Sequence, residues 1–420
     1  MSRFTEQYNK GNLAECVIIG ELTAGILKTG GQKGIEYADV LFNLASVLTD
    51  LGKYERALEI LTETSQIIKA VSGKGLRFAE NLNNLAIVCA KLGKYDVSIR
   101  LHREILRIRD RKLGKHADYC ATLYNLASCH SEIGDFNEAV RYLHTCIVIM
   151  EQDSQINLDY SDALNSLGYC YEQLGEKGLA IRFLRKSLSV IKGLYGENNL
   201  EYLTNAYYLG LVFSRHRDLR NAERFFRISA KIIKKLYSDK NYNYAEVISR
   251  LSDIHRENND LEHSVLLKEK AVEIIRNSFG GNHLSCANHL IDLASMYHEM
   301  NDDIHAIRTT LEAIEIKKSI FGSAHLNCIN DIMSVCGMYI DRYEYDKAVE
   351  LVCDAVKHIS PDETDVRGLL SELTRFCDTL KRLSKITGDK IIEPLDIPDE
   401  TDEIILAMFR DLYKKINSGG

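Results

Sequence analysis

Side-chain amides recur in this sequence at a fixed interval. Asn43, Asn84 and Asn125 lie 41 residues apart, and each is followed by Leu-Ala. An amide side chain donates and accepts hydrogen bonds at the same time, so it can bind a peptide backbone without reading the side chains of that peptide. The chemistry that this pattern offers is recognition, provided that one surface carries all three amides.

Residues that could catalyse a reaction or bind a metal show no comparable arrangement. The glycine-rich segment 25–34 lacks the Gly-Lys-Ser/Thr ending of a phosphate-binding loop. His116, His283 and His325 lie 42 or more residues apart, and His298 belongs to no i, i+4 histidine pair with a catalytic glutamate. We therefore predict no catalytic residues, no metal ligands and no cofactor, and a protein that is not an enzyme.

The eleven cysteines indicate a reducing compartment. Their number is odd, no Cys-x-x-Cys pair occurs, and Cys89, Cys129 and Cys170 fall inside apolar helical patterns. We predict buried free thiols rather than disulfides or zinc ligands. No stretch approaches 18 consecutive apolar residues, and residues 1–10 lack the plan of a signal peptide. We therefore expect a cytoplasmic protein that binds no membrane.

The charge balance disfavours nucleic acid as a partner. The chain has 53 Lys+Arg against 60 Asp+Glu, a net charge of −7, whereas nucleic-acid binding usually requires a basic surface. Two segments, 94–116 and 215–235, are locally basic. We interpret them as solvated helix faces, and the alternative is contact with an anionic partner.

Proline is rare and confined to one end of the chain. The only prolines are Pro361, Pro394 and Pro398, where an average usage of about 5% predicts roughly twenty. Because proline breaks the interior of a helix, the proline-free residues 1–360 indicate continuous helical structure.

A motif of 41 or 42 residues repeats eight times along this proline-free stretch. Its central residues are Leu44, Leu85, Leu126, Leu167, Leu209, Leu251, Leu293 and Val335. Thirteen residues later comes a small side chain, which lets two helices approach closely; these residues are Ala57, Ser98, Ala139, Ala180, Ala222, Ser264, Ala306 and Ala348. Between them lies a turn, first written Gly52-Lys53-Tyr54, in which glycine ends a helix. Each copy therefore predicts a helix, a tight turn and a second helix.

A further landmark marks the joint between copies, ten residues before each central residue. The joint residues are Gly34, Gly75, His116, Asn157, Asn199, Asn241, His283 and His325. Gly, Asn and His are the residues that best tolerate a positive φ or cap a helix. We expect one of these two roles at every joint.

The best preserved copy resembles a known repeat. It contains the runs His116-Ala117-Asp118-Tyr119, Asn125-Leu126-Ala127 and Gly134-Asp135-Phe136-Asn137-Glu138-Ala139. These runs are similar to a tetratricopeptide repeat of the long, kinesin-light-chain type, whose units have about 42 residues. That family often has His-Pro at the joint, whereas this chain has histidine in three copies and proline in none. The resemblance covers residues 36 to about 358 and a leading helix at 11–29.

The resemblance implies an all-α fold, a right-handed α-solenoid (superhelix) of about eight helix-turn-helix repeats with terminal capping helices. We expect residues 1–35 to form an N-terminal capping half-repeat and residues 36–360 to form the eight repeats. Residues 361–420 are expected to hold a capping helix, an acidic linker and an amphipathic terminal helix. This last helix either shields the final repeat or docks into a groove of this chain or of a second copy, which would produce self-association.

The resemblance also implies a binding surface. In tetratricopeptide arrays the first helices line a concave groove, and the residues just before the central leucine point into it. Tyrosines would supply pockets there, and arginines beyond the middle of the chain would suit a ligand with an acidic end. The predicted partner-binding residues are Asn43, Asn83, Asn84, Tyr124, Asn125, Asn165, Tyr207, Tyr208, Arg215, Arg250 and Arg256. The alternative interpretation is ordinary exposed helix surface.

These observations predict a non-enzymatic scaffold or adaptor that holds an extended peptide or a partner protein in the concave groove. A second hypothesis is an intracellular receptor for a signalling peptide. Because the repeats begin near residue 11, we expect no DNA-binding helix-turn-helix before them, so such a receptor would act through another protein. A catalytic site within the array is a third hypothesis, which a turnover assay would test.

Overall fold

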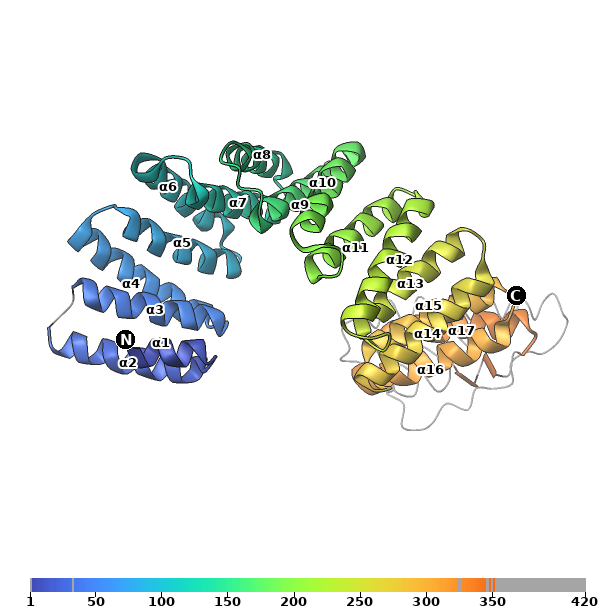
Figure 1. Ribbon diagram of the computed structural model, residues 1–420. Coiled ribbons are helices and arrows are strands. Elements are labelled where there is room, and N and C mark those ends of the chain that lie inside the picture. The colour runs from blue at the N-terminus through green and yellow to red at the C-terminus, as the bar shows by residue number, and fades with distance from the viewer. Residues whose placement is uncertain (1, 32–33, 323–325, 345–346, 349, 352–420) are drawn as a thin grey trace, which may run out of the picture. The chain divides into compact units, whose positions relative to one another are not determined.

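The computed structural model describes residues 2–31, 34–322, 326–344, 347–348 and 350–351. Within these residues every regular element is an α-helix and no strand occurs (Figure 1). In chain order the helices are α1 (Ser2–Asn9), α2 (Leu13–Thr29), α3 (Ile35–Asp50), α4 (Tyr54–Ser72), α5 (Leu76–Lys91), α6 (Tyr95–Leu113), α7 (Ala117–Glu132), α8 (Phe136–Gln152), α9 (Leu158–Gln173), α10 (Lys177–Tyr195), α11 (Leu200–Arg215), α12 (Leu219–Leu236), α13 (Tyr242–Glu257), α14 (Leu261–Phe279), α15 (Leu284–Glu299), α16 (Asp303–Phe321) and α17 (Leu326–Asp341).

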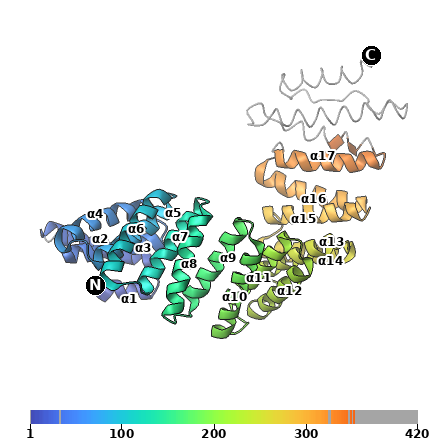
Figure 2. The same ribbon diagram turned by 90° about the horizontal axis from the view of Figure 1, so that it is seen from above.

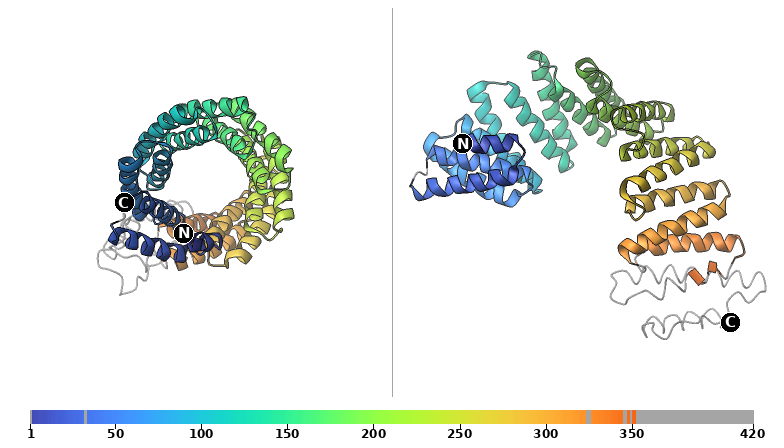
Figure 3. Two further views of the ribbon diagram at one scale, coloured as in Figure 1. Left: turned by 60° about the vertical axis from the view of Figure 1, so that its left-hand side comes forward. Right: turned by 60° about the horizontal axis from the view of Figure 1, so that its bottom comes forward.

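The helices pair across short turns, as the 41- to 42-residue motif predicts. The chain divides into two compact units, Met1–His216 and Arg217–Gly420. In the first unit α3 packs on α4, α5 on α6, α7 on α8 and α9 on α10, and each pair also contacts the next. In the second unit α13 packs on α14 and α15 on α16, and α17 follows α16 as a further layer (Figures 2 and 3). The predicted all-α solenoid is thereby confirmed.

The turn inside each pair keeps one backbone conformation even where its residue type changes. The second residue after the helix that precedes the turn has a positive φ at nine positions, spaced 41 or 42 apart: Gly11, Gly52, Gly93, Gly134, Gly175, Arg217, Asn259, Asn301 and Tyr343. Glycine adopts this left-handed conformation without steric cost, and asparagine tolerates it better than most residues. In the later repeats, where other residues replace glycine, the positive φ is kept, so the period of the turns continues in the backbone conformation.

The seven joint residues within the described part of the chain occupy N-cap positions, and none of them has a positive φ. Gly75, His116, Asn157 and Asn199 all have extended φ values, from −95° to −143°, immediately before a first helix. Asn157 Oδ1 accepts a hydrogen bond from Tyr160 N at 3.1 Å. Such a bond satisfies an N–H group that has no partner inside the helix. Among the described joints, the side chain caps the helix at the three asparagines and at His283, whereas Gly34, Gly75 and His116 hold the N-cap position without a side-chain bond.

Small and branched residues of the motif form the core of each pair. The central Leu126, Leu167 and Leu209 and the small Ala139 are fully buried. Where serine replaces alanine, the Ser98 hydroxyl donates to the Ala86 carbonyl at 2.8 Å, so the buried oxygen keeps a partner. All nine cysteines within the described residues are buried free thiols, which confirms the prediction for these positions.

The predicted C-terminal capping helix, acidic linker and amphipathic terminal helix at residues 361–420 lie outside the described residues. None of the helices in the described part of the chain is both long enough and apolar enough to cross a membrane.

Candidate functional site

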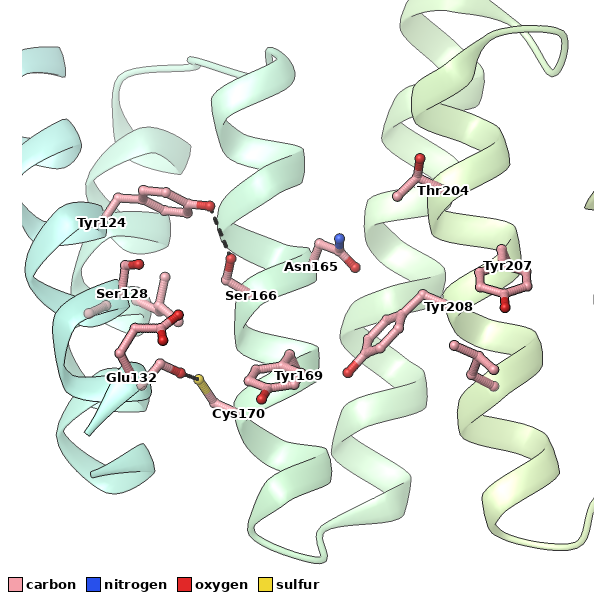
Figure 4. A pocket seen from close by; sticks show the side chains of 14 residues that line it. Tyr124, Ser128, Glu132, Asn165, Ser166, Tyr169, Cys170, Thr204, Tyr207 and Tyr208 are labelled. Atoms are coloured by element: carbon pink, nitrogen blue, oxygen red, sulfur yellow. Dashed lines mark hydrogen bonds between the residues drawn. The ribbon is translucent and has the colours of Figure 1, made fainter. Parts of the chain in front are cut away.

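A cavity of about 400 Å³ opens in the first unit between three first helices, α7, α9 and α11 (Figure 4). All of its lining residues except one leucine of α8 come from these helices. We name it the tyrosine pocket after four of these residues. The lining residues are Tyr124, Ala127, Ser128, Ser131, Glu132, Leu143, Asn165, Ser166, Tyr169, Cys170, Thr204, Tyr207, Tyr208 and Leu211.

The repeat period brings these side chains together. Tyr124, Asn165 and Tyr207 occupy equivalent positions of three successive first helices, two residues before a buried central leucine. Residues three or four apart share one face of a helix, so Ser128 and Tyr169 lie one turn further along the same faces. Stacking of the repeats then places the three faces side by side.

Four of the predicted partner-binding residues therefore line one cavity: Tyr124, Asn165, Tyr207 and Tyr208. Asn125, which directly follows one of them, lies in another cavity of about 270 Å³ beside the joint before α9. A shift of one residue along a helix rotates a side chain by about 100°. Tyr124 lines both cavities, whereas Asn125 lines the second cavity and not the tyrosine pocket.

The remaining asparagines lie outside the tyrosine pocket. Asn43, Asn83 and Asn84 are half-buried on α3 and α5. Asn84 Nδ2 donates to Ser46 Oγ of the preceding repeat at 3.3 Å. The amide is thus in contact with another repeat of the same chain.

Hydrogen bonds between repeats hold the walls of the tyrosine pocket. The Ser166 hydroxyl of α9 donates to the Tyr124 hydroxyl of α7 at 3.2 Å, and Ser131 Oγ lies 3.4 Å from Cys170 Sγ (Figure 4). Both contacts join α7 to α9. A wall that is fixed before a ligand arrives reduces the entropy lost on binding.

A buried carboxylate fixes the other side of the pocket. Glu172 of α9 is almost fully buried, and it accepts hydrogen bonds from the Tyr208 hydroxyl at 2.7 Å and from Arg215 at 2.5 Å. Burial, together with the hydrogen bond to Glu172, raises the pKa of Tyr208. The phenol of Tyr208 therefore stays protonated and its ring stays oriented by α9.

One polar atom of the pocket has no partner within the described residues. Asn165 Oδ1 is buried and accepts no hydrogen bond there, and its amide extends from α9 toward α11 (Figure 4). A buried acceptor without a donor costs about 1–3 kcal/mol. A ligand that supplies an N–H or O–H group at this point would recover that free energy.

The charge of the lining is slightly acidic. Glu132 is its one ionisable carboxylate, and no histidine, lysine or arginine belongs to it. The lining therefore offers aromatic faces, hydroxyls and an amide, which suit binding of a neutral or cationic group.

The predicted arginines are paired with carboxylates. Arg250 lies 3.6 Å from Asp253 in the second unit. Arg256 Nε donates to Glu299 at 3.0 Å, likewise in the second unit. Arg215 is bound to Glu172 in the first unit, as described above. Each positive charge is compensated within the chain, which weakens the expectation of a ligand with an acidic end.

One arginine of the locally basic segment 94–116 does not belong to a solvated face. Arg109 is buried, and its guanidinium donates to the Thr122 hydroxyl and to the Asp118 carbonyl, both at 2.5 Å. The interpretation of that segment as a solvated helix face is therefore wrong for this residue, because its charge is used to connect α6 with α7.

Sequence reasoning missed part of the pocket. Ser128, Glu132, Tyr169 and Thr204 were not among the predicted residues, although they line it. The available signal was helical spacing, since Ser128 and Glu132 lie four and eight residues after Tyr124. Tyr169 lies four residues after Asn165, and Thr204 lies three residues before Tyr207, so helical spacing relates all four to predicted residues.

Models of known families match several segments of the chain. Tetratricopeptide repeat models match residues 38–75, 77–152 and 161–192. A model for anaphase-promoting complex subunit 5 matches residues 233–336. No curated protein matches the sequence.

Solved structures with a similar arrangement share little sequence with this chain. The apo form of the quorum sensor NprR from B. thuringiensis has a TM-score of 0.51 at 15% identity, over 75% of this chain and 85% of that chain. BtubC (BKLC) from P. vanneervenii has a TM-score of 0.47 at 18% identity, over 55% and 91%. The apo form of RapI has a TM-score of 0.49 at 15% identity, over 67% and 98%. With its matching repeat models and its periodic helix pairs, the chain is a tetratricopeptide repeat protein.

Proposed function

We propose that this protein is a non-enzymatic scaffold or adaptor that binds an extended peptide or a segment of a partner protein along its first helices. The tyrosine pocket is the centre of this site. The observation that supports the proposal most directly is the buried Asn165 Oδ1, an acceptor to which no described residue donates, among four tyrosines of three successive first helices. Tetratricopeptide repeat proteins are generally non-enzymatic, in agreement with this proposal.

The chemistry of the pocket indicates what the ligand presents. A peptide backbone N–H or a side-chain amide would donate to Asn165 Oδ1. An aromatic or aliphatic side chain would pack between the tyrosine rings, and the volume of about 400 Å³ suits one or two such side chains. Because Glu132 is the charged group of the lining, a neutral or basic peptide fits better than an acidic peptide or a nucleic acid.

The proposal can be tested with peptides selected from a displayed library on the full chain. Asn165→Ala should weaken binding of the selected peptides by about tenfold, because a lost hydrogen bond to a buried amide corresponds to about 1.4 kcal/mol. Tyr207→Ala should weaken it at least as much. Fluorescence anisotropy with labelled peptide measures both affinities.

The matched control is Asn137→Ala, which removes the same side chain from an exposed position on α8, outside the pocket. Its affinity should equal that of the unmodified chain. If Asn165→Ala and Tyr207→Ala bind the selected peptides as tightly as Asn137→Ala does, the tyrosine pocket is not the binding site.

A receptor for a short signalling peptide is the second candidate. The tyrosine pocket lies within three repeats, so a ligand of a few residues could fill it. NprR, which has this fold over much of its length, is a quorum sensor. A short peptide that raises the melting temperature at near-stoichiometric concentration would favour the receptor. A response only to long segments or folded partners would favour the scaffold.

The second unit extends the scaffold proposal. Its match to a model of anaphase-promoting complex subunit 5, a family named after a subunit of a complex, fits a role in holding partner proteins. We place this activity in the cytoplasm and expect no nucleic acid or membrane as partner. Self-association through the C-terminal helix stays a prediction.

A further inference from the structure

Two histidines and an aspartate converge at the turn between α13 and α14 in the second unit. His255 Nδ1 lies 2.8 Å from Asp260 Oδ2, and His263 Nδ1 lies 2.9 Å from Asp260 Oδ1. One ligand atom of each residue lies within 4.8 Å of those of the other two. No second trio of His, Cys, Asp or Glu in the described part of the chain meets this condition.

The backbone holds these three residues in place. His255 lies in the last turn of α13, and Asn259 makes the sharp reversal with its φ of 60°. Asp260 is the N-cap of α14 and accepts a hydrogen bond from the backbone N–H of His263. The three side chains are therefore brought together by the turn that every repeat contains, before any ligand is present.

The following repeat contains half of this arrangement. His305 Nδ1 lies 2.7 Å from Asp302 Oδ2, which reproduces the contact between His263 and Asp260. Tyr297 stands where His255 would be, and its ring centroid lies 5.3 Å from that of His305. The corresponding distance between the two histidine rings is 5.6 Å. The same three positions are therefore present in this repeat, but Tyr297 has no imidazole nitrogen to bind a metal ion.

The other half occurs in the first unit. His130 Nδ1 lies 3.1 Å from Asp135 Oδ2, at the positions that correspond to His255 and Asp260. Glu138 takes the third position, and its carboxylate is bound by Arg141. Each half of the trio is therefore an ordinary turn or capping contact. Within the described residues, both halves share one aspartate only at the turn between α13 and α14.

The ligand set and its spacing match a borderline divalent cation. Imidazole nitrogen and carboxylate oxygen bind Zn²⁺ at about 2.0–2.2 Å, and neighbouring ligand atoms in a tetrahedral site lie about 3.3 Å apart. The two nitrogen–oxygen distances of 2.8 and 2.9 Å need to increase by only about half an ångström. The side chain of His263 is 67% exposed and can make this movement.

The local charges do not oppose a cation. Asp260 brings a carboxylate between the two imidazoles, with one oxygen toward each of them. The neighbouring Arg256 is bound to Glu299. A metal ion would replace the protons that the two nitrogens now share with the carboxylate.

We propose that His255, Asp260 and His263 form a binding site for a divalent transition-metal ion, with Zn²⁺ as the best match. The ion joins the end of α13 to the start of α14 and keeps one or more positions for water or for a side chain of a partner. The site departs from the sequence prediction of no metal ligands, because its histidines are eight residues apart across a turn rather than four apart on one helix. It is independent of the tyrosine pocket.

The test is calorimetric titration of the metal-free full chain with zinc chloride. The unmodified chain should bind one Zn²⁺ ion at its highest-affinity site, and Zn²⁺ should raise its melting temperature. Two substitutions, His255→Tyr and His263→Asn, should each weaken the affinity of this site for Zn²⁺ by at least about tenfold. The first introduces the residue that the next repeat has at this position. Asn221 already occupies the position of His263 in another repeat and bonds Asp218 at 2.9 Å, so His263→Asn fits the fold.

Two further variants use the half-sites of the chain. His305→Asn removes another exposed histidine beside an N-cap aspartate and should leave the affinity of the tightest site unchanged. Tyr297→His should complete a second trio with Asp302 and His305 and raise the stoichiometry to two. Substitution with Co²⁺ supplies a geometric measurement, since the visible absorption of a tetrahedral site should be lost in His255→Tyr.

The proposal is overturned if His255→Tyr and His263→Asn bind Zn²⁺ with the affinity and stoichiometry of the unmodified chain. Equal losses in His305→Asn and His263→Asn would also contradict it, because scattered surface histidines would then account for the binding. Circular dichroism of each variant establishes that its helices are intact.

Discussion

One position in the second helix of each repeat lies in the core but does not always carry an apolar side chain. It is occupied by Leu61, His102, Leu143, Leu184, Phe226, Lys268 and Thr310, all of them buried. A buried polar group costs free energy unless it finds a partner. The three polar members of this series therefore determine how the stability of their repeats responds to pH and substitution.

His102 makes the first unit sensitive to acid. Burial, with a smaller contribution from Arg109, lowers its pKa from 6.5 to about 4. Between pH 6.5 and pH 4 the unfolded chain binds a proton at His102 and the folded chain does not. The stability that neutral His102 contributes to the folded chain is therefore fully present above pH 6.5 and is lost as the pH falls toward 4. The free energy of unfolding decreases by about 3 kcal/mol through this one group. His102→Leu, the residue of the neighbouring repeats, should reduce the decrease in unfolding free energy between pH 7 and pH 4 by that amount.

Urea denaturation at the two pH values measures this effect. His116→Leu is the control, because the His116 side chain is 68% exposed. This substitution should leave the pH dependence as it is in the unmodified chain. Equal pH dependence of His102→Leu and His116→Leu would show that His102 is not the group responsible.

Lys268 satisfies its buried charge by reaching first helices of two repeats. Its Nζ lies 2.8 Å from Asp292 Oδ2 of α15 and 2.9 Å from Ser249 Oγ of α13. Lys268→Met removes the donor and should lower the unfolding free energy by roughly 2 kcal/mol, less than for a fully buried pair because Asp292 stays partly solvated. A double-mutant cycle with Asp292→Asn should give a coupling of about 1 kcal/mol. A coupling near zero would mean that the ion pair does not stabilise the second unit.

At the scale of elements, the turn after each first helix is set by backbone conformation. Gly134 has a φ of 79°, and a Cβ atom there would meet nothing within 4 Å. Gly134→Ala should therefore lower the unfolding free energy by about 1 kcal/mol through conformation alone. Gly193→Ala, at an exposed site inside α10 where a Cβ atom also meets nothing, should raise it by up to about 1 kcal/mol. Chemical denaturation distinguishes the two, and changes of the same sign would refute the conformational explanation.

At the scale of the whole molecule, contacts run mainly between neighbouring helices, as in other solenoids. Stability is then close to a sum of local terms, and a unit with its own core can fold without the rest of the chain. All lining residues of the tyrosine pocket belong to the first unit. The proposed peptide-binding site and the proposed metal site therefore lie in different units.

A fragment of residues 1–216 should accordingly fold and keep the tyrosine pocket. We expect a helical circular dichroism spectrum, a cooperative thermal transition, and affinity for peptides selected on the full chain within about tenfold, or 1.4 kcal/mol. A folded fragment that no longer binds these peptides would show that binding needs the second unit. An unfolded fragment would show that the first unit is not autonomous.

Much of the fold could be predicted because its determinants are local. The spacing of Leu126, Gly134 and Ala139 encodes a helix, a left-handed turn and a close helix contact within fifteen residues. The candidate site was less predictable. Tyr124, Asn165 and Tyr207 are predicted groove residues and share the tyrosine pocket, whereas the adjacent Asn125 lines only the second cavity, to which Tyr124 also contributes. Which side of a helix faces a cavity depends on rotations of a few tens of degrees that residue types do not encode.

The amino-acid sequence by itself determined the repeat, its helices, its turns and its buried thiols, because each follows from interactions between residues close in the chain. Tertiary structure alone decided which polar atoms gain partners. Arg215 is bound to Glu172, 43 residues away, and Asn165 Oδ1 accepts no hydrogen bond from any residue that the structure describes. These outcomes depend on packing between helices and repeats, where distances of less than an ångström decide between a contact and none.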